Sequence, residues 1–202
     1  MTFLLHRHGG CILPPSSAQV THISPVKDKI SILAVSGSLR RNSSNNAVIT
    51  TAATLVAGEV DMIIYEGLAS LPHFDGSDQP SPEVTGFRRL LTEVDGVLIS
   101  SPEYAFGVPG SLKNALDWTV STGEFVNKPV AVITAATGGN NAHASLLLTL
   151  TALSARVVED ATLLIPYVRS KMDASNEVTD DATIQAIKNI MDTFIHEIKN
   201  KN

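Results

Sequence analysis

The chain of 202 residues has a single cysteine, Cys11, and no excess of basic side chains. One thiol cannot form an internal disulfide, which excludes a disulfide-stabilised secreted scaffold and a cysteine-based zinc module. A net charge of −5 gives no basic stripe for a nucleic acid. No apolar run approaches the roughly 20 residues of a membrane span. We therefore expect a cytoplasmic protein that binds neither nucleic acid nor metal.

Residues 1–28 differ from the rest of the chain. They contain histidines and prolines but no sustained period of 2 or 3.6, so they predict a flexible N-terminal tail. Arg7 and two nearby histidines interrupt the apolar start, which is atypical of a signal peptide. The remaining residues, 29–202, are expected to form one domain, because 44% hydrophobic content provides a large core.

From residue 29 onward, apolar, β-branched runs alternate with amphipathic stretches. The runs that predict strands are 29–37, 61–66, 95–101, 128–136 and 157–166. The stretches that predict helices are 45–56, 84–92, 109–120, 142–154 and 180–198.

Five βα units predict an α/β fold with helices on both faces of a doubly wound parallel sheet. The flavodoxin-like strand order 2-1-3-4-5 is the simplest topology for that count. Near-continuous apolar runs in the first, third and fourth strands fit burial on both faces. Ligands of such sheets bind beyond the carboxyl ends of the strands, so the loops after these strands are the candidate site.

The loop after the first strand reads SGSLRRNSSNNA (36–47). A glycine turn, hydroxyls, an arginine and a helix N-terminus together suit a phosphate. The loop contains neither a dinucleotide fingerprint nor a Walker motif. The alternative is a polar turn in which Ser43 or Ser44 only caps the helix.

The loops after the third and fourth strands suit a flat ring. In SPEYAFGVPGSLKNALDW (101–118), Tyr104 and Phe106 offer apolar surface, although they could instead pack over the next helix. In TAATGGNNAHAS (134–145), adjacent glycines let backbone amides approach a heterocycle, although a plain turn is the alternative. Trp118 is expected to lie in the core rather than contact a ligand. His143 is expected to be structural or exposed rather than an acid–base group.

Taken together, these loops resemble the NADPH-dependent FMN reductase family of flavodoxin-like quinone, chromate and azo-dye reductases. GSLRRNSSN (37–45) matches the family's phosphate loop, GSLRxxSxN, and residues 101–118 match its flavin-ring loop. TGG (137–139) occupies the place of the third flavin loop. The similarity spans residues 29–198.

The resemblance implies a binding residue at each matching position. It implies that the FMN phosphate is held by Ser36, Ser38, Arg40, Ser43 and Asn45. It implies that the isoalloxazine is lined by Pro102, Glu103, Tyr104 and Phe106, with Thr137 and Gly138 at its pyrimidine edge. It also implies homodimers or homotetramers with active sites near subunit interfaces.

The implied activity is transfer of hydride from NADPH or NADH, through the flavin N5, to a quinone or another small oxidant such as chromate, an azo compound or free flavin. The flavin carries the electron chemistry, so no catalytic side chain is expected. Two alternatives remain open at this point: a flavodoxin-type electron carrier that serves a protein partner, and a flavin-free module that kept the fold.

Overall fold

A computed structural model describes residues 29–200, and the predicted tail lies outside these residues. Five parallel strands form one sheet in the order β2-β1-β3-β4-β5, which confirms the predicted topology. The strands are β1 Ile30–Ser36, β2 Val60–Tyr65, β3 Gly96–Ser101, β4 Pro129–Ala135 and β5 Arg156–Ile165. The helices are α1 Ser44–Val56, α2 Pro82–Glu93, α3 Gly110–Asp117, α4 Asn140–Ala152 and α5 Asp181–Lys199.

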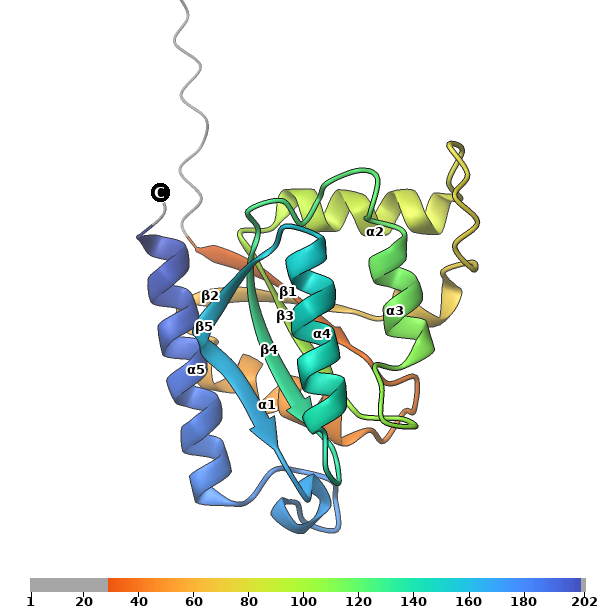
Figure 1. Cartoon of the computed structure of the whole chain (residues 1–202). Helices are drawn as coiled ribbons and strands as arrows, with labels where there is room; N and C mark the ends of the chain where they lie inside the picture. Colours follow the sequence, from red (N-terminus) through yellow and green to blue (C-terminus); the bar gives the residue numbers. More distant parts are fainter. Residues whose placement is uncertain (1–28, 201–202) are drawn as a thin grey trace, which may run out of the picture.

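Two hydrophobic cores cover the two faces of the sheet. Alternate strand residues point to opposite faces, as Ile32 and Leu33 of β1 do. The Ile32 side packs against α1 and α5, and the Leu33 side packs against α2, α3 and α4. Figure 1 shows α4 in front of the sheet and α1 behind it. Helices on both faces explain why the central strands β1, β3 and β4 are almost entirely buried.

Two short 3-10 helices, η1 (Gly67–Ser70) and η2 (Val168–Lys171), follow the two edge strands and were not predicted. Strand β5 also shifts its register between the Val130 and Val132 positions of β4. Trp118 caps the C-terminus of α3, and its side chain is 2% exposed, as expected of a structural residue.

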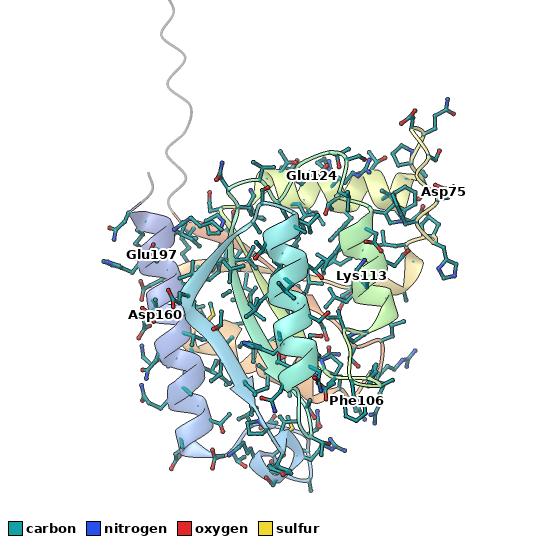
Figure 2. The ribbon with its side chains drawn as sticks, in the orientation of Figure 1. Asp75, Phe106, Lys113, Glu124, Asp160 and Glu197 are labelled. Atoms are coloured by element: carbon teal, nitrogen blue, oxygen red, sulfur yellow. The ribbon has the colours of Figure 1, made fainter. Side chains whose placement is uncertain are left out.

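All five strands end at the same edge of the sheet because they are parallel. Figure 2 labels Phe106 at this edge and Glu124 at the opposite end of the molecule. The three loops singled out from the sequence therefore meet at one end of the domain. No helix of the described residues is long and apolar enough to cross a membrane.

Candidate functional site

The segment between β1 and α1 lies against β3. The Gly37 amide donates to the Ser100 carbonyl over 2.8 Å, one bond beyond the β1–β3 ladder. A Cβ at residue 37 would approach Leu112 Cδ2 and Ser101 Oγ to 3.0 Å. Glycine allows this close approach without displacing Leu112 or Ser101, and the loop starts from a point fixed against β3.

Ser43 is the N-cap of α1. Its hydroxyl oxygen accepts the Asn45 amide over 3.1 Å, so the capping interpretation holds for Ser43. A hydroxyl that accepts one bond still has its own proton to donate, and capping therefore leaves Ser43 able to contact a phosphate. The first turn of α1 holds no acidic side chain, which leaves the positive end of the helix dipole available to an anion.

The Asn45 side chain joins three elements in the interior. Its amide nitrogen donates to the Ala135 carbonyl over 3.0 Å, and its amide oxygen accepts the Ser100 hydroxyl over 2.9 Å. The residue is 2% exposed. It thus ties α1 to the carboxyl ends of β3 and β4, and its contact with a phosphate stays a prediction.

The loop after β3 makes a tight turn at its tip. Tyr104 and Gly107 exchange two backbone hydrogen bonds of 3.1 and 3.0 Å. The two residues between them, Ala105 and Phe106, have φ of 49° and 59°. Two residues without a glycine rarely take such values, so the turn is locally strained. It leaves the Phe106 side chain 80% exposed at the sheet edge.

The same loop contacts both of its neighbours. The Tyr104 hydroxyl lies 3.4 Å from the Ser38 hydroxyl in the loop after β1. The Glu103 carboxylate accepts the Ala142 amide over 2.9 Å, in the first turn of α4. Negative charge is favourable at a helix N-terminus, so Glu103 fixes the flavin-ring loop to α4. This contact gives Glu103 a structural role beside its predicted place at the ring.

Gly139 has φ of 106° and precedes α4. A Cβ at this residue would lie 2.7 Å from Leu164 Cδ1. The positive φ strongly favours glycine here, and any larger residue would also displace the Leu164 side chain; this glycine is the N-cap of α4. Thr137 and Gly138, predicted at the pyrimidine edge, are exposed beside this turn.

A cavity of about 150 Å³, called here the central cavity, opens where the three loops meet. The predicted residues that line it are Arg40, Ser43, Asn45, Pro102, Glu103, Tyr104 and Thr137. Ligand-enclosing pockets commonly measure roughly 300–1,000 Å³, so this cavity can enclose only part of a flavin nucleotide. The remainder of such a ligand would lie on the open surface beside it.

Four predicted residues lie away from the lining of the central cavity: Ser36, Ser38, Phe106 and Gly138. Ser36 and Ser38 instead line a cavity of about 710 Å³ beside β2, called the β2-side cavity, together with Arg40 and Arg41. Arg40 thus stands between the two cavities. The structure does not bring all the predicted phosphate ligands into one cavity.

Arg169 of η2 lines the central cavity and was missed in the sequence. A basic residue just after the last strand was an available signal, because that strand ends at the same edge as the others. No motif surrounds Arg169, so local sequence pattern does not distinguish it from other basic residues.

His143 is half-buried in the first turns of α4, with Nδ1 2.8 Å from Thr134 Oγ1. Burial lowers its pKa below the usual 6.5, so the ring is neutral at pH 7. A neutral ring bonded to a buried hydroxyl is consistent with the structural role expected of it.

Comparison with known proteins identifies the family. The model for the family described as NADPH-dependent FMN reductase matches residues 30–169. The chain belongs to this family. Membership confirms the expected resemblance and an oxidoreductase that uses FMN with NADPH or NADH. The electron-carrier alternative is not favoured.

Individual relatives agree with the family assignment. A quinone reductase of Escherichia coli is 27% identical over 179 residues, which cover 84% of this chain and 95% of that protein. An NAD(P)H-dependent FMN reductase of Pseudomonas aeruginosa is 29% identical over 171 residues, covering 81% and 92%. The solved structure of FerB, a flavoenzyme NAD(P)H:(acceptor) oxidoreductase from Paracoccus denitrificans, superimposes with a TM-score of 0.75. It is 26% identical and covers 85% of this chain and 98% of its own.

Proposed function

We propose that this FMN reductase passes electrons from NADPH or NADH to quinones and other small oxidants, with FMN held at the central cavity. The observation that carries the proposal is the meeting of the three loops there, with Arg40, Ser43 and the N-terminus of α1 on one side and Tyr104 on the other. Relatives named for quinone reduction support the acceptor class.

The residues at the cavity fit an FMN phosphate. Arg40 offers a charged fork, Ser43 a hydroxyl, and α1 the positive end of its dipole. The cavity's volume suits a phosphate and the adjoining sugar chain better than a whole flavin. Ser36 and Ser38, on the side of the β2-side cavity, and Asn45, through its interior bonds, would then hold this phosphate loop in place.

When bound, FMN supplies the atom that accepts and passes on hydride. The chain supplies position and an apolar surface. Tyr104 and Phe106 are 46% and 80% exposed, a large apolar area at the edge where the ring would lie. The strained turn from Tyr104 to Gly107 sets the direction of Phe106. Glu103 anchors the same loop to α4. Pro102, Thr137 and Gly138 would complete the ring's surroundings.

We further propose that the enzyme is a cytoplasmic homodimer or homotetramer in which a second subunit covers this edge. The support is the exposure of two aromatic side chains, Tyr104 and Phe106, in one turn at this edge. Large apolar side chains in such a position commonly belong to an interface. Quinones and nicotinamide would then bind in a shared space above the flavin.

An absorbance spectrum of the purified protein, followed by addition of NADPH or NADH without air, tests this function. We expect a yellow protein whose flavin absorbance is bleached by the nucleotide and restored by a quinone. A coloured protein that neither nucleotide reduces would support an electron carrier, and a colourless protein that does not take up FMN would support a flavin-free module.

Steady-state kinetics test the use of one site by both substrates. Because a single apolar surface serves donor and acceptor in turn, double-reciprocal lines at several acceptor concentrations should run parallel. Intersecting lines would indicate a ternary complex and a separate acceptor site.

A further inference from the structure

The connection between β5 and α5 is fastened to the site at its start. The Tyr167 amide donates to the Thr137 carbonyl over 3.1 Å, and the Val168 amide donates to the Ala136 carbonyl over 3.2 Å. Val168 is 4% exposed. These bonds place the next residue, Arg169, at the wall of the central cavity.

The Arg169 side chain is then directed toward the phosphate loop. Its Nη1 donates to Asn176 Oδ1 over 2.6 Å, and Asn176 Nδ2 lies 3.4 Å from the Ser43 carbonyl oxygen that it donates to. Asn176 has φ of 65°, which asparagine tolerates better than most residues. One amide therefore joins the Arg169 guanidinium to the N-cap of α1.

The charges around the cavity favour an anion. Its lining contains two arginines, Arg40 and Arg169, and one carboxylate, Glu103, which is engaged by the α4 amide of Ala142. Among the described residues, neither arginine forms an ion pair with a carboxylate, whereas the nearby Lys171 lies 3.6 Å from Asp180. With two arginines and one carboxylate in its lining, the cavity has a local excess of positive charge in a chain of net charge −5.

We infer that Arg169 is a second arginine for the flavin phosphate, in addition to Arg40, and that Asn176 is its positioning residue. The inference rests on the proposed FMN site. It assigns a binding role to a segment outside the three loops.

Titration of the full-length chain with FMN and with riboflavin tests this role, because riboflavin lacks only the phosphate. We expect Arg169→Ala to raise the Kd for FMN roughly tenfold to a hundredfold, the usual effect of losing a charge-assisted contact, and to leave the Kd for riboflavin unchanged. Arg169→Gln, which keeps much of the length and hydrogen-bonding capacity without the charge, should give a similar loss. Arg89→Ala removes an exposed arginine from α2 and is the control.

The positioning role is tested with Asn176→Gly, which permits the positive φ while removing the amide. We expect a several-fold rise in the Kd for FMN that disappears when the Arg169→Ala background is used, because Asn176 acts through Arg169. Equal losses for FMN and riboflavin in Arg169→Ala would mean that the arginine addresses the ring or only holds the loop, and would overturn the inference.

The same titration separates this inference from the proposed function. A wild-type chain that fails to bind FMN contradicts the proposed site itself. A wild-type chain that binds FMN normally, together with Arg169 variants of unchanged affinity, contradicts only the role of Arg169.

Discussion

The loop after β1 and the loop after β3 meet at one edge of the sheet but are held in different ways. The first leads into α1, where Ser43 caps the helix and the buried Asn45 side chain bonds to β3 and β4. The second ends in an exposed turn whose central residues, Ala105 and Phe106, have positive φ. One loop is fixed by interior hydrogen bonds, and the other presents a strained apolar tip.

This difference fits two separate tasks. A phosphate is held by charge and by hydrogen-bond donors in fixed positions, which interior bonds provide. Acceptors of varied shape need apolar area more than fixed donors, and an exposed aromatic side chain provides it. Changes in the first loop should therefore affect stability and cofactor affinity, and changes in the second should affect the choice of acceptor.

The largest effect, on stability, is expected for Asn45→Ala, which changes the loop that is held by interior hydrogen bonds. It leaves the Ala135 carbonyl and the Ser100 hydroxyl without their partner, and each buried unsatisfied group costs about 1–3 kcal/mol. Thermal and urea unfolding should show a loss of about 2–4 kcal/mol. Asn46→Ala, which removes longer and more exposed contacts, is the control and should change much less. Equal stabilities for the two variants would disprove the interior role.

The second largest effect is expected for Arg40→Ala, and it should change the affinity for FMN rather than stability. Losing one charge-assisted contact costs about 1.5–3 kcal/mol, so the Kd for FMN should rise tenfold to a hundredfold while the Tm hardly changes. Arg41→Ala is the matched control, because Arg41 lines the β2-side cavity but not the central cavity. A larger loss in Arg41→Ala would move the phosphate into the β2-side cavity.

Phe106→Ala tests the other loop. It should alter the ratio of kcat/KM between bulky and small quinones by several-fold and change the Kd for FMN by less than about threefold, since the removed side chain supplies apolar contact only. Val126→Ala removes a different exposed apolar side chain, in the connection between α3 and β4, and should leave both quantities unchanged. If Phe106→Ala weakened FMN as much as Arg40→Ala does, the division between the loops would be lost.

The smallest effect concerns pH and His143. Because burial lowers the pKa of the folded ring, the unfolded chain binds a proton first as pH falls below 6.5. Stability should therefore decrease as pH falls through this range and level off below the folded pKa. His143→Gln should reduce the change in the free energy of unfolding between pH 7 and acidic pH, as measured by urea unfolding. An unchanged dependence of stability on pH would mean that other titratable groups cause the loss of stability in acid.

The sequence supported much of the fold and part of the site. Apolar β-branched runs of strand length predicted all five strands. The central strands β1, β3 and β4 show no polar alternation because helices cover both of their faces. The loop that begins at Gly37 could also be predicted, from its glycine and polar residues. The short helices η1 and η2 could not, because they depend on how the chain returns across the sheet edge rather than on periodicity.

The sequence by itself determined the alternation of strands and helices, and it determined which loops lie at the carboxyl edge of the sheet. Both follow from local pattern and parallel topology. Tertiary structure alone decided the partners of Asn45, the anchoring of Glu103 on α4 and the contact of Asn176, the partner of Arg169, with Ser43. These contacts join residues between 39 and 133 positions apart. Hydrogen bonds at such separations depend on the packing of the sheet edge, which no local sequence pattern specifies.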